Sequence, residues 1–134
     1  MDKLITIASI QMFVHKQKKN NLQEVEKHLS YINQVFPQVN MVVFPELSAT
    51  DKFVDIKDQA EKLPGNLTDF FSGLAKKYGL WLIPGSIYER SGDDIYNTSF
   101  VLSPKGDLIG KYRKRYPWCP YEKTIPGTDP FVFT

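Results

Sequence analysis

Four residues in the sequence have side chains whose type and spacing could support hydrolytic chemistry. Glu46 directly follows an apolar run and a proline, in MVVFPE, and a carboxylate where a buried strand ends is well placed to act as a general base. Lys114 lies in the basic cluster KYRKR, and Cys119 and Glu122 follow it closely. From position alone, a general base and a solvent-facing glutamate are about equally good interpretations of Glu46.

The basic cluster divides its side chains between two faces if it forms a strand. Period-two alternation separates Lys114 from the other three basic residues, Lys111, Arg113 and Arg115. A lysine that points inward among apolar groups needs a carboxylate partner, because an unpaired buried charge is costly. Glu46 and Glu122 are the candidates for that partner. Binding of nucleic acid by the same cluster, with its interleaved tyrosines, is an alternative.

Cys119 is the one cysteine of the sequence and lies in the segment PWCP. A nucleophilic cysteine needs a base or a helix N-terminus nearby, and the local sequence offers neither, so we interpret Cys119 as a small buried hydrophobic residue. A single cysteine excludes an internal disulfide and a cysteine-based zinc site. The sequence has neither a glycine-rich phosphate loop nor a metal-ligand spacing, so we expect no metal and no other cofactor.

Length and composition are those of one average globular domain. The chain has 134 residues, of which 42% are hydrophobic and 24% charged, and its formal net charge is +2. This charge balance argues against nucleic acid or an anionic membrane as the main partner. No apolar run reaches the ~20 residues of a membrane span, and the opening MDKLITIASIQM lacks the pattern of a signal peptide. We therefore expect a cytoplasmic protein.

The order of the predicted elements indicates an α/β fold. Apolar, β-branched runs alternate with segments of helical spacing as β-α-β-α-β, which favours a parallel or mixed sheet with helices against one face. Strand-like runs separated by SGDD and SPKGD then predict an antiparallel meander. We expect strands at 4–11, 41–44 and 80–87, helices at 20–36 and 70–78, and the meander strands at 88–89, 96–103 and 108–112.

The ends of these elements carry further predictions. Asn20 or Asn21 is available to cap the first helix and Thr68 the second, while Pro37 and Gly79 should end them. The first strand is apolar on both parities, as if covered on both faces. The last residues, FVFT, have strand composition, and an unshielded edge strand there suggests either that another polypeptide completes the sheet or that the chain is cut short.

Together, these motifs resemble the nitrilase, or carbon–nitrogen hydrolase, superfamily. The match runs in order through MVVFPELS, LAKKYGLWLIPGSIYER, YNTSFVLSPKGDLIGKYRK and PWCPYEKTIPG. The last segment is most similar to the aliphatic amidase and formamidase branch. One departure is Asp51-Lys52-Phe53, where many members have glycine followed by an aromatic residue.

The resemblance implies an αββα sandwich of two sheets. Residues 1–134 would form about the first half of this sandwich, so the domain would be incomplete at its C-terminus. It also implies a Glu-Lys-Cys mechanism for amide hydrolysis, in which Glu46 corresponds to the general base, Lys114 to the catalytic lysine and Glu122 to an accessory glutamate. Trp118 would line the substrate pocket. Cys119 matches a non-nucleophilic cysteine, so the nucleophile would be missing and the chain alone inactive.

The expected partners follow from the same resemblance. They are a small-molecule amide or nitrile substrate and either further copies of the chain, in a homo-oligomer, or a completing C-terminal half. A non-catalytic module that serves oligomerisation or partner binding is the alternative. The acid released and the substrate group (amide, nitrile, carbamoyl or ureido) stay open.

Overall fold

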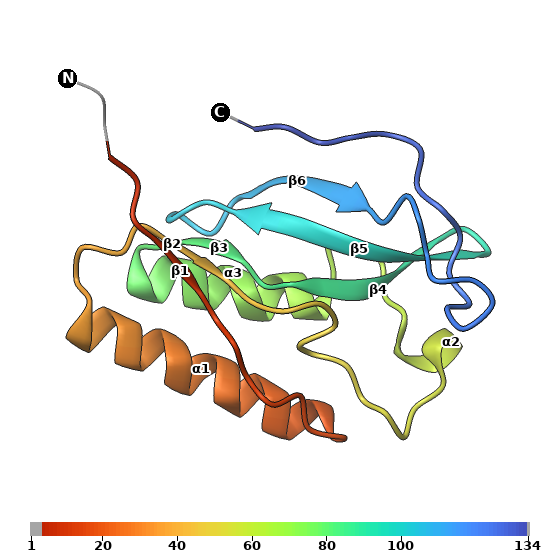
Figure 1. The fold of residues 1–134 in the computed structure, drawn as a ribbon, viewed down its shortest axis with the longest axis horizontal. Coiled ribbons are helices and arrows are strands. Elements are labelled where there is room, and N and C mark those ends of the chain that lie inside the picture. The colour runs from red at the N-terminus through yellow and green to blue at the C-terminus, as the bar shows by residue number, and fades with distance from the viewer. Residues whose placement is uncertain (1–3, 134) are drawn as a thin grey trace.

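Six strands form one mixed sheet, and two long helices cover one of its faces (Figure 1). The structure, a computed structural model, describes residues 4–133. Within this range, no helix is long and apolar enough to cross a membrane. The elements are β1 (Ile7–Ser9), α1 (Lys18–Val35), β2 (Met41–Val43), α2 (Ile56–Gln59), α3 (Asn66–Tyr78), β3 (Trp81–Ile83), β4 (Ser86–Ser91), β5 (Asp94–Leu102) and β6 (Leu108–Arg113).

The sheet topology confirms the predicted β-α-β-α-β unit followed by a meander. Strands β1, β2 and β3 are parallel neighbours, and β4, β5 and β6 pair antiparallel. The predicted single strand at 80–87 is wrong, because Pro84 and Gly85 divide it into β3 and β4. Both halves nevertheless lie along the same side of β5, since Leu82 pairs with Leu102 and Ile87 with Thr98.

The hydrophobic core lies between the helices and the sheet. From the helices it receives Val25, Leu29, Phe71 and Leu74, and from the strands Val42, Leu82, Phe100 and Leu102, all of them buried. The helices therefore cover one face, as the pattern predicted. The short helix α2 was not predicted; Asp55 caps it by accepting a hydrogen bond from the Lys57 backbone N–H.

The helix ends correct two of the predicted caps. α1 begins at Lys18, and Asn21 is buried inside it, where its side-chain amide binds the backbone of His15 and Thr50 instead of capping the helix. Thr68 is the third residue of α3 and accepts a hydrogen bond from the Gly65 N–H. A contact with the distant Thr50 backbone thus helps to hold Asn21, whereas Thr68 takes part in the local cap at Gly65 from inside the helix.

The predicted C-terminal ends of the two helices are confirmed. α1 stops at Val35, two residues before Pro37, because proline cannot continue the helical hydrogen bonds. Gly79 ends α3 in the left-handed conformation (φ 63°), which glycine adopts without a Cβ clash.

The sheet face away from the helices is less covered than predicted. β1 was expected to be buried on both faces, but Ile7 in this edge strand and Ile5 just before it are exposed. The C-terminal segment runs past β6 on this side (Figure 1). There the Phe131 ring packs against Gly110, and the Phe133 ring lies 5.9 Å from Trp81. The predicted strand character of 131–133 is wrong, because this segment joins no strand.

Candidate functional site

Glu46 is presented by a sharp turn that follows β2. Leu47, directly after it, has a positive φ of 53°, a backbone conformation that costs a non-glycine residue energy unless its surroundings enforce it. Two hydrogen bonds do so: the Leu47 N–H donates to Ser86 Oγ (3.1 Å), and Ser48 Oγ donates to the Pro84 carbonyl (2.8 Å). The turn is therefore held in place by the short connection between β3 and β4 and by the first residue of β4.

Gly85 makes this close approach possible. Its φ is 82°, and a Cβ at this position would collide with the backbone carbonyl of Pro45. The Pro84-Gly85 interruption, which the sequence pattern did not reveal, thus allows Pro45, at the start of the turn that presents Glu46, to pack closely on the sheet.

Lys114 directly follows β6, and two backbone hydrogen bonds hold it. Its N–H donates to the Asn97 carbonyl (2.8 Å), and its carbonyl accepts from the Gly127 N–H (2.9 Å). The predicted alternation is confirmed for three of the four basic residues, because Lys111 and Arg113 both bind Glu89 while Lys114 binds other groups. The end of β6 therefore places Lys114 at the site, while Lys111 and Arg113 contact Glu89.

The structure brings Glu46, Lys114 and Glu122 into direct contact, from three parts of the chain. Lys114 Nζ donates to Glu46 Oε1 at 2.9 Å and to Glu122 Oε1 at 2.6 Å. The ammonium has three N–H donors, so one is left for another ligand. The Glu46 side chain is 53% exposed, which corrects the expectation of a carboxylate near the core, whereas that of Glu122 is 25% exposed.

Charge pairing stabilises the ionised forms of Lys114 and Glu122. The hydrogen bonds to Glu122 and Glu46 raise the pKa of Lys114. Burial alone would raise the pKa of Glu122, but the Lys114 ammonium and the Trp118 backbone N–H lower it below its ordinary value. Burial and the charges of Glu122 and Glu46 raise the pKa of nearby Tyr88. At neutral pH Lys114 is thus an ammonium paired with the Glu122 carboxylate.

A cavity of about 240 Å³ opens beside this trio. It is lined mainly by the ends of β2 and β3 and by the β5–β6 pair: Phe44, Glu46, Ile83, Asn97, Tyr112 and Lys114 are among its walls. Mixed apolar and ionic walls of this kind suit a small polar molecule. Among residues 4–133, no group of three or more histidine, cysteine or acidic side chains is arranged to hold a metal ion.

The segment 117–122 supplies Glu122 but places its other two candidates outward. The Trp118 ring is 69% exposed and packs on Tyr121, and only the Trp118 backbone reaches the site, by donating to Glu122 Oε1 at 3.1 Å. Cys119 is exposed, which overturns its interpretation as a buried hydrophobic residue. The tight turn in this segment, with the Glu122 N–H bonded to the Trp118 carbonyl, explains why Cys119 projects to solvent.

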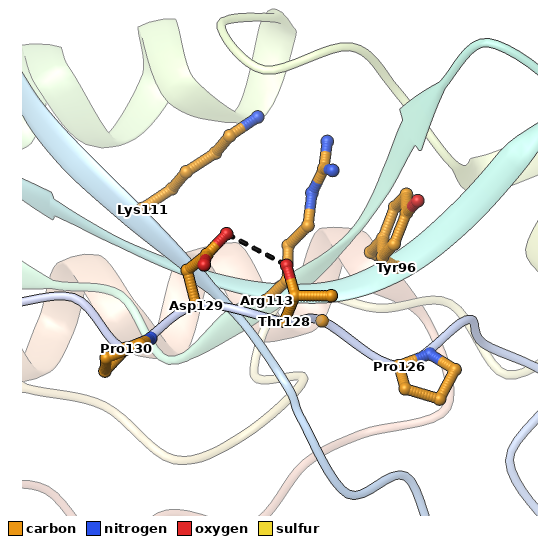
Figure 2. Close-up of a pocket in the computed structure, with 8 residues that line it drawn as sticks. Tyr96, Lys111, Arg113, Pro126, Thr128, Asp129 and Pro130 are labelled. Atoms are coloured by element: carbon orange, nitrogen blue, oxygen red, sulfur yellow. Dashed lines mark hydrogen bonds between the residues drawn. The ribbon is translucent and has the colours of Figure 1, made fainter.

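A second ionic cluster, which the sequence did not indicate, lies on the other face of β6. Glu89 is only 2% exposed and accepts hydrogen bonds from Lys111, Arg113 and Thr98. Figure 2 shows Lys111, Arg113 and Tyr96 side by side, with the segment that contains Thr128 and Asp129 running past them. Burial would raise the pKa of Glu89, but its three donors lower it to about 2. This cluster ties β4, β5 and β6 together.

Asn97 is a further residue of the site, and the sequence did not predict it. Its Nδ2 donates to Glu46 Oε1 at 2.7 Å. The available signal was a polar residue within the apolar strand segment that precedes the basic cluster, in YNTS.

Comparison with known proteins assigns the chain to a family. Residues 6–133 match the family model for carbon-nitrogen hydrolases. A formamidase from Helicobacter acinonychis (strain Sheeba) is 33% identical over 122 residues, which are 84% of this chain and 35% of the relative. The omega-amidase NIT2 of Danio rerio is 36% identical over 110 residues, covering 81% of this chain and 39% of the relative.

Solved structures agree with these sequence relatives. Nit3 of Saccharomyces cerevisiae, described as a member of branch 10 of the nitrilase superfamily, superposes with a TM-score of 0.80 at 27% identity. The match covers 93% of this chain and 49% of Nit3. A carbon-nitrogen hydrolase from Helicobacter pylori G27 gives 0.79, also at 27% identity, over 92% of this chain and 45% of its own.

The fold is therefore the N-terminal part of the nitrilase fold, and the chain spans less than half the length of these relatives. The order of motifs, the matched fold and the family model all agree. The chain belongs to the carbon-nitrogen hydrolase family.

Proposed function

We propose that this chain supplies the base and lysine for hydrolysis of a small amide to an acid and ammonia. The observation that carries the proposal is the single ammonium of Lys114 held between the carboxylates of Glu46 and Glu122, beside a cavity of substrate size. The names of the relatives, formamidase and omega-amidase, support an amide over a nitrile. An ionic trio at the converging strand ends is what a hydrolase of this chemistry requires.

The chemical steps use the groups as follows. Glu46 removes the proton of a cysteine thiol, and the sulfur attacks the amide carbon to form a tetrahedral oxyanion. The third N–H of Lys114 faces that oxyanion and stabilises it. The C–N bond then breaks, the nitrogen leaves as ammonia with the proton returned by Glu46, and a thioester forms. Water, deprotonated by Glu46, attacks the thioester, releasing the acid and restoring the thiol.

The nucleophile in this proposal is a cysteine outside residues 1–134. Cys119 is exposed, and it is not among the residues that line the cavity at Glu46 and Lys114. Trp118, exposed beside Glu122, would border the mouth of the site and contact the part of the substrate that extends outward. Residues 1–134 alone would then lack turnover.

Ammonia release from short aliphatic amides tests the proposal. The coding sequence after the Thr134 codon is read first, and residues 1–134 and any longer chain that it encodes are assayed together. We expect turnover only in a chain with an added cysteine, and we expect Glu46→Gln or Lys114→Met to abolish it while Cys119→Ser leaves it intact. Turnover by residues 1–134, lost in Cys119→Ser, would overturn the assignment of the nucleophile.

A second candidate function, association without catalysis, rests on the open sheet face. Ile5, Ile7 and Val132 are exposed there, and an apolar cavity lies nearby between Leu4, Trp81 and Phe133. Large exposed apolar areas mark interfaces. Sedimentation of residues 1–134 as a stable oligomer, with no amide turnover in any encoded chain, would favour this reading.

A further inference from the structure

Asn97 contacts both Glu46, the proposed base, and Lys114, the lysine proposed to stabilise the oxyanion. It lies in β5, opposite Tyr88 of β4, and is only 3% exposed. Its side-chain Nδ2 donates to Glu46 Oε1 at 2.7 Å, while its backbone carbonyl accepts the N–H of Lys114 at 2.8 Å. One buried residue thus contacts the carboxylate through its side chain and the lysine through its main chain.

The orientation of the Asn97 amide follows from chemistry. An ionised carboxylate only accepts hydrogen bonds, so the NH₂ group must face Glu46 and the amide oxygen must point away. A neutral donor suits this position, because a second cation there would compete with Lys114 and a carboxylate would repel Glu46. The Asn97 amide also lowers the pKa of Glu122, which is consistent with a donor placed close to both acids.

The two oxygens of Glu46 are consequently unequal. Oε1 accepts from both Asn97 and Lys114, whereas Oε2 has no hydrogen-bond partner among residues 4–133. The Glu46 side chain is half-exposed and has three rotatable bonds, so the lysine alone would leave its carboxylate free to turn about a single contact. Two donors on the same oxygen define the plane of the carboxylate and the direction of Oε2.

We propose that Asn97 is a positioning residue that fixes Glu46 so that Oε2, the unoccupied oxygen, is the atom that takes the proton of the nucleophile. This inference rests on the proposed function, in which Glu46 is the general base. Asn97 itself neither touches the reacting atoms nor changes charge. Its contribution is to reduce the number of orientations that Glu46 samples before proton transfer.

A steady-state comparison in the longest chain that the coding sequence encodes tests the catalytic part. A hydrogen bond to a charged group is lost in Asn97→Leu, and in Asn97→Asp the donor becomes an acceptor, so kcat should fall about 10- to 100-fold with KM little changed. The matched control is Thr98→Val, which removes a buried hydrogen bond from the next residue of β5, made to Glu89 instead of the site. It should lower the melting temperature and leave kcat within about twofold.

The outcomes separate this inference from the proposed function. If Glu46→Gln keeps full turnover, the proposed function fails. If Glu46→Gln abolishes turnover but both Asn97 variants keep kcat, or if Thr98→Val lowers kcat as much as they do, only the role of Asn97 is refuted.

A spectroscopic measurement on residues 1–134 needs no turnover and tests the contact itself. The side-chain amide resonance of Asn97 is followed by ¹H–¹⁵N NMR while the pH is lowered. Because Nδ2 donates to Glu46, its protons should shift as the pH falls, and the shift should be clearly smaller in Glu46→Gln, where only Glu122 remains as an acidic neighbour. An Asn97 resonance that does not move, or that titrates equally in Glu46→Gln, would overturn the proposal. Glu46 is half-exposed, so this variant is expected to fold.

Discussion

Replacing Glu89 with glutamine should destabilise the fold strongly at neutral pH and much less in acid. The pKa of Glu89 is about 2 in the folded chain, against an ordinary value of 4.5. At 1.36 kcal/mol for each unit, the ionised carboxylate contributes about 3 kcal/mol to the free energy of unfolding at pH 7. A neutral glutamine cannot provide this stabilisation, because Lys111 and Arg113 lose the negative charge that they share.

The sign of the pH dependence follows from the lowered pKa. The stabilisation is complete above pH 4.5 and disappears as the pH falls through the folded value of about 2. At pH 3 the same two pKa values leave about 1.5 kcal/mol. The difference between wild type and variant should therefore shrink to less than half between pH 7 and pH 3.

Thermal and urea unfolding, followed by circular dichroism at both pH values, measure this difference. For a chain of 134 residues, ~3 kcal/mol corresponds to a fall in melting temperature of about 12 °C. The control is Glu24→Gln, which removes the exposed pair with Lys27 and should leave the melting temperature nearly unchanged. A Glu89 variant as stable as the Glu24 variant at pH 7, or a difference that is equal at pH 7 and pH 3, would refute the reasoning.

Three further predictions follow from the site. Gly85→Ala should lower the melting temperature far more than Gly92→Ala, because both have positive φ but only at Gly85 does a Cβ meet the neighbouring backbone; equal losses in differential scanning calorimetry would contradict this. Glu122→Gln should lower the pKa of Lys114, since Glu122 is its strongest partner, and NMR of the labelled ammonium at alkaline pH measures the change, which an unaltered titration would disprove. Cys119 should react with a thiol reagent in the folded chain at the rate of an exposed cysteine, and protection until unfolding would show that this segment is misplaced.

Local patterns in the sequence determined the fold class and most element positions. Runs such as MVVF and the spacing of Val25, Leu29 and Ile32 encode their own periodicity, so the order of strands and helices was predictable. The alternation in KYRKR likewise separated Lys114 from its neighbours, because side-chain direction along a strand is a local property. Charge also named Glu46 and Glu122 as candidate partners of Lys114, since an inward lysine must find an acid, and the structure pairs it with both.

What only the tertiary structure decided are contacts between residues far apart in the chain. Asn21, predicted as a cap, is buried and donates to the backbone of Thr50, 29 residues away, as well as to that of nearby His15. The division of β3 from β4 goes with the close approach of Gly85 to the Pro45 carbonyl, which is far away in the chain. The roles of Glu89 and Asn97 were not predictable for the same reason: a buried polar residue is identified by its partners, and partners 24 or 51 residues away leave no local pattern.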